Sequence, residues 1–354
     1  MKQFLQQLKQ FKSGKFEILF TALLIVMPAS AYALKYKHIV AFGDSLSDHY
    51  NLNTYISTAQ ESMTNGDVWV EYLSRELNAT LDNNAFIGAM TRKHLYDNIQ
   101  AMSDSGTIPQ MGLNGQIENY IEEAHEFNPN ETLFSIWIGS NNLIKFGKGE
   151  FGDITPEQMI SNAMTDIGEA VTKLLNIGAT QYIVMNLPDI GKSPWYGSGT
   201  PEQVAAASQL AFGYNDALMY TINQLLMDKP GIKLYCFDMV QIMNEIVEKE
   251  IFPNITGSYK VLDEGGYPTE DVNGPAENYL FWDGVHPTTK AHEYFANVVA
   301  TTVLYDGFFS QQALDDAVLK ERMKWDIKND NVLGLEEAIH ALKICSEAPP
   351  NDEN

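Results

Sequence analysis

A serine near the beginning of the chain and an Asp-x-x-His pair near its end have the residue types of a hydrolytic triad. Asp283 and His286 stand three residues apart within Phe281–Pro287. A serine hydroxyl is a weak nucleophile that needs an adjacent base to take its proton. At this spacing the carboxylate and the imidazole can share one face of a turn, where the acid would hold the imidazole in its useful tautomer, a task that a backbone carbonyl could share. We therefore predict Ser45 as the nucleophile, His286 as its base and Asp283 as the orienting acid.

The surroundings of Ser45 leave two alternatives open. His49 lies four residues after Ser45 and is the rival base. An isolated Asp44-Ser45 pair would more often belong to a helix-capping turn than to an active site. Only the distant Asp-x-x-His pair favours the catalytic interpretation.

Acyl transfer also requires hydrogen-bond donors for the oxyanion that develops in the transition state. The candidates are the backbone N–H groups of Ser45 and Gly88 and the side chain of Asn141, which follows a buried strand and a glycine. Four apolar residues close to these donors in the sequence are candidates for binding the substrate, with ordinary core packing as the alternative. They are Met90, Leu143, Ile144 and Phe146.

Short apolar segments that alternate with longer helical patterns must position these residues. The strand candidates are residues 38–42, 132–138, 182–187 and 234–237. The helix candidates are residues 68–77 and 117–127, and two helices that begin at the capping boxes Thr155-Pro156-Glu157-Gln158 and Thr200-Pro201-Glu202-Gln203. This alternation predicts an α/β fold with a parallel sheet and helices on both faces.

Polar segments follow the carboxyl ends of three of these strands. They are Gly43–Asp48, Gly139–Asn142 and Asn186–Gly191. In a sheet of this type, ligands bind beyond the carboxyl ends of the strands. We therefore expect the polar groups to converge at one rim of the sheet. The Gly-x-Ser-x-Gly elbow, the His-Glu-x-x-His motif and the P-loop are absent from the sequence. The sequence therefore supports neither a zinc hydrolase nor a nucleotide-binding protein.

The composition indicates an acidic globular protein, and the N-terminal segment indicates export. Of the 354 residues, 45% are apolar and 19% are charged, and the formal net charge is −23. This charge disfavours nucleic acid as a partner and electrostatic docking on anionic lipid. A basic segment, an apolar stretch and small residues up to Ala33 predict a signal peptide over residues 1–33, with an uncleaved anchor as the alternative. Export permits a disulfide between Cys236 and Cys345, although two free thiols are the equal alternative.

Four ordered blocks of the sequence resemble the GDSL (SGNH) lipase/esterase family. They are Phe42–Asp48, Gly88, Gly139–Asn141 and Asp283–Pro287, and the resemblance covers residues 36–303. It implies a three-layer α/β/α, flavodoxin-like fold with a parallel sheet. It also implies a serine nucleophile, an Asp-x-x-His dyad and Gly and Asn oxyanion donors. These roles map onto Ser45, Asp283, His286, Gly88 and Asn141.

Residues 65–73 and 184–191 look like the bacterial branch of secreted phospholipases A, lysophospholipases, haemolysins and glycerophospholipid:cholesterol acyltransferases. Two residues depart from the family pattern. Asn142 replaces the usual Asp after the oxyanion Asn, and Ile87 replaces a Gly before Gly88. Both adjoin the oxyanion donors without deleting one, so they put the shape of the acyl pocket in question rather than the activity.

The resemblance implies a secreted or periplasmic serine ester hydrolase that forms an acyl-enzyme on Ser45. Its expected substrates are lipid acyl esters, cleaved by a lysophospholipase or phospholipase A type of activity, with acyl transfer to other acceptors also in its range. The chemistry requires no cofactor, and contact with a membrane surface would be transient. A carbohydrate O-acyl esterase is the alternative enzyme, and a catalytically inactive binding or adhesion module is the alternative of another class.

The last part of the chain has a different character, which predicts a helical extension over residues 306–354 after a hydrolase domain over residues 34–305. Residues 326–337 resemble one EF-hand or dockerin-type calcium loop, with Asp326, Asp330 and Glu337 as the implied ligands. Lys328 stands at a ligand position and cannot bind calcium. We therefore favour a relic loop that caps a helix pair, with calcium binding as the alternative.

Overall fold

The computed structural model describes residues 35–55, 63–92, 110–227 and 229–305. The predicted signal peptide, Cys345 and the predicted calcium loop lie outside the described residues. The chain divides after Thr301 into two compact units, and the description below concerns the first.

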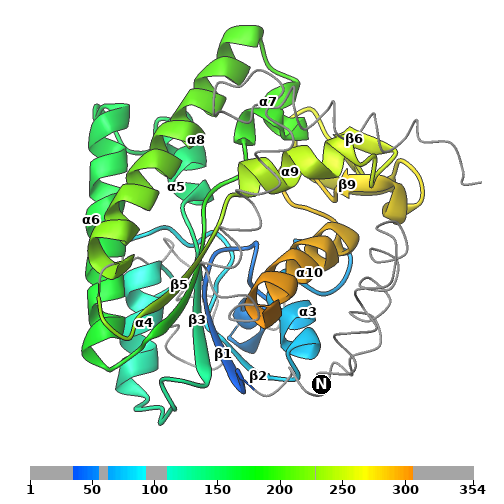
Figure 1. Cartoon of the computed structure of the whole chain (residues 1–354). Coiled ribbons are helices and arrows are strands. Elements are labelled where there is room, and N and C mark those ends of the chain that lie inside the picture. Colours follow the sequence, from blue (N-terminus) through cyan, green and yellow to red (C-terminus); the bar gives the residue numbers. More distant parts are fainter. Residues whose placement is uncertain (1–34, 56–62, 93–109, 228, 306–354) are drawn as a thin grey trace, which may run out of the picture. The chain divides into compact units, whose positions relative to one another are not determined.

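A five-stranded parallel sheet forms the centre of this unit (Figure 1). Its strands are β1 (His38–Gly43), β2 (Thr80–Asn83), β3 (Thr132–Trp137), β4 (Gln181–Met185) and β5 (Lys233–Phe237). They are arranged in the order β2-β1-β3-β4-β5, and every neighbouring pair is parallel. This is the strand order of flavodoxin-like folds. The predicted α/β/α fold class is therefore confirmed.

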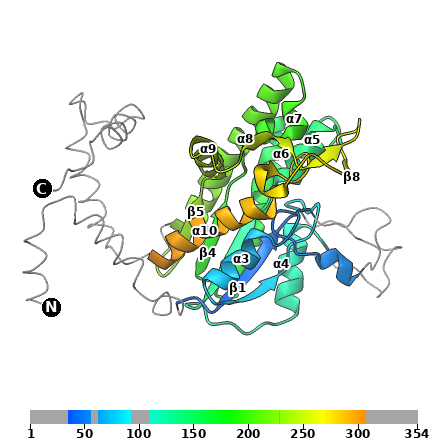
Figure 2. The ribbon, with the colours of Figure 1, turned by 90° about the vertical axis from the view of Figure 1, so that its right-hand side faces the viewer.

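Helices cover both faces of the sheet. Those that lie beside it are α3 (Trp69–Glu76), α4 (Leu113–Glu122), α6 (Pro156–Asn176), α8 (Pro201–Ile222) and α10 (Thr289–Tyr305). Helices α4, α6 and α8 lie on one face, and α3 and α10 lie on the other (Figure 1). In Figure 2 the second face is turned to the viewer, with α3 and α10 in front of the strands.

The central strands have the sequences that a sheet covered on both faces requires. Every residue of β3 and β4 is buried, and only His38 of β1 is exposed. A strand buried on both faces has a nearly continuous apolar run instead of an alternating one. This is why the four strands with apolar runs were predictable to within about two residues at each end, the uncertainty expected of such boundaries.

The two predicted capping boxes begin the two longest helices. The Thr155 hydroxyl accepts the Gln158 N–H at 3.3 Å, and Gln158 Oε1 accepts the Thr155 N–H at 2.8 Å. Thr200 and Gln203 repeat this exchange at 3.4 and 2.8 Å at the start of α8. Each box satisfies backbone donors that have no partner inside the helix.

Shorter elements lie between and beyond the strands. They are α5 (Ser140–Gly147), α7 (Pro194–Gly197), α9 (Met239–Glu248), the 3-10 turns η2 (Asn51–Thr54), η4 (Ile190–Lys192) and η6 (Ala276–Asn278), and the π-helical turn η5 (Asn223–Met227). After α9, strands β6 (Asn254–Ser258) and β9 (Tyr279–Phe281) pair with each other, and β7 (Lys260–Leu262) and β8 (Pro268–Val272) form an antiparallel hairpin. These small strands were not predicted from the sequence.

The structure differs from the sequence-based description in three other details. The helix predicted at 117–127 is α4, which begins at Leu113 and ends at Glu122, because Ala124 adopts a φ of 54° that a right-handed helix cannot continue through. Strand β2 was missed because it has only four residues, of which three are polar, and none of them is fully buried. Ser45 is followed by a tight turn and then by the 3-10 turn η2, and α3 begins at Trp69. In the described residues, no helix is long and apolar enough to cross a membrane.

Candidate active site

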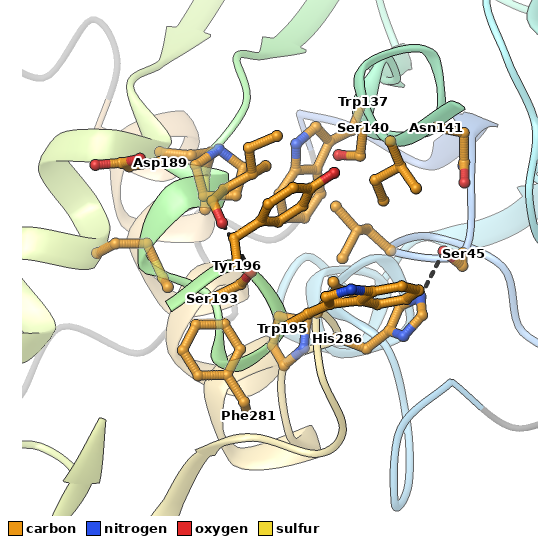
Figure 3. A pocket seen from close by; sticks show the side chains of 18 of the residues that line it. Ser45, Trp137, Ser140, Asn141, Asp189, Ser193, Trp195, Tyr196, Phe281 and His286 are labelled. Carbon is orange, nitrogen blue, oxygen red and sulfur yellow. Dashed lines mark hydrogen bonds between the residues drawn. The ribbon is translucent and has the colours of Figure 1, made fainter. Parts of the chain in front are cut away.

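Ser45, His286 and Asp283 meet beyond the carboxyl end of β1. Ser45 Oγ lies 2.9 Å from His286 Nε2 (Figure 3), and His286 Nδ1 lies 2.8 Å from Asp283 Oδ2. Because Nδ1 faces a carboxylate, it is the nitrogen that carries the proton of the neutral ring, and Nε2 can accept the Ser45 proton. The arrangement therefore has the geometry of a nucleophile, a base and an orienting acid.

A closed loop holds the acid and the base together. Asp283 Oδ1 accepts the N–H groups of Val285 at 2.8 Å and His286 at 2.7 Å. The Trp282 N–H donates to the His286 carbonyl at 2.7 Å and closes the loop. One carboxyl group thus fixes both the imidazole ring and the backbone that carries it.

Charges around the imidazole oppose the effect of its burial. Burial raises the pKa of Asp283, whereas the charge of His286 and the three hydrogen bonds of the carboxyl group lower it. The pKa of Asp283 therefore stays below its usual value. Burial lowers the pKa of His286, but Asp283 and, more weakly, Asp44 raise it above its ordinary value. Burial also raises the pKa of Asp44 to about 7. The site therefore stabilises the imidazolium that forms when His286 takes the serine proton.

Hydrogen bonds fix the backbone on both sides of Ser45. Asp44 Oδ1 accepts the Leu46 N–H at 3.1 Å. Gln116 of α4 spans the end of β1, where its Oε1 accepts the Gly43 N–H at 3.0 Å and its Nε2 donates to the Gly43 carbonyl at 2.8 Å. The position of the Ser45 hydroxyl is therefore set by the sheet and by α4.

The loop that carries Gly88 is held beside the serine turn. Asp48 Oδ2 accepts the Ile87 N–H at 2.7 Å, and Asn141 Nδ2 donates to the Ala89 carbonyl at 3.0 Å. Gly88 itself has a φ of 69°, a left-handed conformation that favours glycine. The three predicted sources of oxyanion donors, Ser45, Gly88 and Asn141, are thus gathered at one rim of the sheet.

Asn141 is placed by the turn from β3 into α5. Gly139, which precedes α5, has a φ of 126°, and a Cβ atom there would collide with the Tyr214 hydroxyl group. Any larger residue would clash, so glycine is required for the chain to bring Asn141 to the pocket. Only one of the two amide hydrogens of Asn141 is needed for Ala89, which leaves the other for a substrate oxygen.

Asn142 has a physical reason to differ from the family pattern. Its Oδ1 accepts the Thr91 N–H at 3.1 Å, and its Nδ2 donates to Thr91 Oγ1 at 2.9 Å. The Thr91 hydroxyl already donates to Asp166 at 2.8 Å. An ionised aspartate at position 142 would place two acceptors against one hydroxyl proton, whereas the amide satisfies both partners.

An apolar cavity of about 210 Å³ opens beside Ser45 and His286. Six aromatic side chains and two methionines are among the residues that line it. They are Trp137, Trp195, Tyr196, Phe281, Phe295, Tyr267, Met239 and Met243. Trp195 and Tyr196 extend from α7 into this cavity (Figure 3). The exposed residue Lys148 also borders it, with its Nζ 4.7 Å from the centroid of the Trp195 ring.

The four predicted substrate-binding residues lie in different places. Only Ile144 lines the cavity that contains Ser45. Leu143 and Phe146 line a neighbouring cavity of about 540 Å³ instead. Met90 is buried, and its carbonyl accepts the Leu113 N–H at 2.9 Å. Helix geometry explains the division, because successive residues of α5 point in different directions.

The rival base faces another partner. His49 Nδ1 lies 3.6 Å from Glu71 Oε1, and the interaction raises the pKa of His49. Its side chain borders a small crevice with Asp48 and Glu71 and not the cavity of Ser45. Among the described residues, no cluster of three His, Cys, Asp or Glu side chains could hold a metal ion. Asp326, Asp330, Glu337 and Cys345 lie outside them, and Cys236 is exposed and pairs with no other cysteine of the described residues.

Sequence reasoning missed most of the cavity wall and one residue of the rim. Trp195, Tyr267 and Phe281 come from three separate segments, and no periodic pattern connects them. Asp48 lies within the Gly-Asp-Ser-Leu block, but only the folded chain shows that it holds the Ile87 N–H. Its signal in the sequence was its place in the polar segment Gly43–Asp48, which follows the strand predicted at residues 38–42.

The family of this chain follows from a comparison with known proteins. A model of the GDSL-like lipase/acylhydrolase family matches residues 39–299, and the chain belongs to this family. It is therefore an esterase or lipase by class.

Two named relatives give the resemblance more detail. A thermolabile hemolysin of Vibrio parahaemolyticus is 25% identical over 281 residues, which cover 73% of this chain and 62% of that protein. A phosphatidylcholine-sterol acyltransferase of Aeromonas hydrophila is 23% identical, with 76% of this chain and 90% of that protein covered. This chain thus spans less than two thirds of the hemolysin.

Solved structures resemble this chain more distantly. A phospholipase A1 of Streptomyces albidoflavus has 14% sequence identity and a TM-score of 0.40, and the match covers 75% of this chain and 98% of that one. The acetylxylan esterase Axe2 of Geobacillus stearothermophilus has 13% identity and a TM-score of 0.43, with 77% and 96% covered.

Proposed function

We propose that this protein is an exported serine hydrolase that cleaves acyl esters of glycerophospholipids and lysophospholipids. The observation that carries the proposal is the apolar cavity that Ser45 and His286 both line. An acyl chain is bound by burial of its apolar surface, and an aromatic and methionine-rich wall provides that burial next to the nucleophile. The relative named as a phosphatidylcholine-sterol acyltransferase supports a lipid acyl donor.

In this proposal, the Ser45 hydroxyl attacks the ester carbonyl while His286 Nε2 takes its proton. Asp283 stabilises the imidazolium, and Ser45, Gly88 and Asn141 donate to the oxyanion. His286 then returns the proton to the leaving alcohol, and the acyl group stays on Ser45 as an ester. Water, activated by His286, attacks this acyl-enzyme and releases the fatty acid and the free serine. No cofactor takes part in these steps.

The segment proposed to export the protein is residues 1–33, which have the basic, apolar and small-residue parts of a signal peptide. One 21% identical relative, from Salmonella typhimurium, is named a secreted effector protein, which supports export. Expression with and without residues 1–33 tests it, because only the full chain should then appear outside the cytoplasm in a shortened form.

A substrate panel tests the proposed activity. Wild-type protein and Ser45→Ala would be incubated with lysophosphatidylcholine, a diacyl phosphatidylcholine and acetylated xylan, and the released acid would be measured. We expect fatty acid from the phospholipids, little acetate from xylan, and neither product from the variant. Acetate as the main product would favour the carbohydrate esterase, and no product from any substrate would favour a binding module.

A further inference from the structure

The neighbouring cavity of about 540 Å³ has the character of a second binding site for an apolar chain. Helices α5 and α8 contribute Leu143, Phe146, Ala206 and Leu210 to its wall. Its lining residues, all within the described part of the chain, include no charged side chain. In a protein with a net charge of −23 this is an unusual surface, and its size lies within the range of small-molecule sites, roughly 300–1,000 Å³.

One wall separates this cavity from the one that contains Ser45. Ile190, Trp195 and Tyr196 line both cavities. Tyr196 and Trp195 extend from the short helix α7 toward the first cavity in Figure 3. The two cavities are therefore neighbours that share this partition.

The partition is held in place from several sides. The Trp195 N–H donates to the Gly284 carbonyl at 2.9 Å, next to the loop of Asp283 and His286. Its ring meets the Tyr267 ring edge-on, with centroids 5.9 Å apart. On the other side of α7, the Ser198 hydroxyl donates to the Trp195 carbonyl at 2.7 Å. These contacts favour a fixed divider between two separate sites over a lid that opens.

We propose that the second cavity binds the acyl chain that is not cleaved when the substrate is a diacyl glycerophospholipid. This inference rests on the proposed function. A diacyl lipid carries two chains on adjacent glycerol carbons, so an ester placed at Ser45 with one chain in the first cavity has a second chain that must lie close by. Two apolar cavities on either side of the Trp195 partition accept such a forked ligand.

The charge beside the partition fits the third substituent of the glycerol. Lys148 is exposed, borders the first cavity and lies with its Nζ over the Trp195 ring. In a diacyl glycerophospholipid, the negatively charged phosphodiester stands on the third glycerol carbon, close to the two carbons that carry the chains. A cation on the partition is complementary to that charge, whereas a neutral triglyceride or an acetylated sugar would gain nothing from it.

The exposed face of α8 offers a matched pair of variants. Ala205 and Ala206 are adjacent and exposed, but only Ala206 lines the second cavity. Ala206→Trp introduces a large side chain at the cavity, and Ala205→Trp introduces the same side chain beside it. The measurement is kcat/KM for a diacyl phosphatidylcholine and for lysophosphatidylcholine of the same acyl length, both in mixed detergent micelles.

We expect Ala206→Trp to lower the ratio of diacyl to lysophospholipid hydrolysis at least about tenfold, because displacing even two methylene groups from the cavity has an effect of this order. Ala205→Trp should keep the wild-type ratio. Leu210→Trp, one turn further along α8, tests the same wall independently and should also lower the ratio.

Three results would overturn the inference. They are an unchanged ratio in both Ala206→Trp and Leu210→Trp, an equal fall in Ala205→Trp, and a wild-type protein that hydrolyses lysophosphatidylcholine but not the diacyl lipid. In the last case the proposed function would still stand for lysophospholipids. A wild-type protein that hydrolyses neither lipid would overturn both.

Discussion

The polar rim around Ser45 and the apolar wall beside it are built by different kinds of interaction. In the rim, which comprises Ser45, Asp283, His286, Asn141 and the loop of Gly88, directional hydrogen bonds between 2.7 and 3.0 Å hold nearly every group. In the wall of Trp195, Tyr196 and Tyr267, hydrogen bonds hold the backbone, and the side chains of Trp195 and Tyr267 pack against each other as rings beside a four-residue helix. Proton transfer depends on geometry within fractions of an ångström, whereas binding of an acyl chain depends mainly on the area buried.

This contrast predicts that changes in the rim lower kcat by orders of magnitude and that changes in the wall alter KM by small factors. The largest effect is expected for Ser45→Ala, because it removes the attacking oxygen. Turnover should fall by at least about 10³-fold. Ester hydrolysis measured beside the melting temperature checks this, since a folded variant that retains a tenth of wild-type activity would exclude Ser45 as the nucleophile.

Asp283→Asn should lower the maximal rate by at least about 10²-fold, since the imidazole loses its orienting charge. His286 is a base only when neutral, so activity rises with pH through the pKa of His286, which Asp283 holds above its ordinary value. Without that charge the pKa falls, and the acid limb of the pH profile should move to lower pH. An acid limb that stays in place would show that Asp283 does not act on His286.

Asn141→Ala should lower kcat by roughly 10²-fold with little change in KM, because its amide is used mainly by the oxyanion of the transition state. Steady-state kinetics on one ester suffices to measure the two constants. If kcat is unchanged, the role belongs to the backbone donors of Ser45 and Gly88 alone.

Asp48→Asn should have a smaller effect, about tenfold on kcat. Its carboxylate accepts the N–H groups of both Ile87 and Asn51, and an amide can accept at only one of its two atoms. Asp48 is thus a positioning residue for the loop of Gly88. The split between kcat and KM distinguishes this role from a general loss of structure, which would lower the melting temperature and the fraction of active protein without changing KM or the kcat of each active site.

The smallest effect is expected in the wall. Tyr267→Ala removes a half-exposed ring that packs on Trp195, a contact worth about 0.5–1.5 kcal/mol. We expect KM for a long-chain ester to rise about two- to tenfold and kcat to change little. A kcat loss as large as that of Asn141→Ala would erase the distinction between rim and wall.

The same contrast decides what the sequence could predict. Ser45, Asn141 and the pair of Asp283 and His286 follow recognisable strands or form a short local motif, so their types and spacing are visible before folding. The structure brings them together because parallel strands end at one edge. Strand β2 was missed because its polar residues do not alternate as those of a half-buried strand do.

The wall was not predictable in this way. Trp195 stands in a four-residue helix after β4, and Tyr267 lies in the turn between β7 and β8, more than seventy residues later. Packing of this kind depends on contacts between distant segments that local propensity does not encode. Of the three residues predicted from their proximity to Asn141, only Ile144 therefore lines the first cavity, whereas Leu143 and Phe146 line the second.

Covalent labelling tests the role of Ser45 most directly. A fluorophosphonate reacts with a serine that a neighbouring base activates, and peptide mass spectrometry locates the adduct. We predict one adduct on Ser45 in the wild-type protein, a greatly slowed reaction in His286→Ala, and no adduct in Ser45→Ala. Labelling of a different serine, or undiminished labelling after Ser45→Ala, would contradict the assignment of Ser45 as the nucleophile.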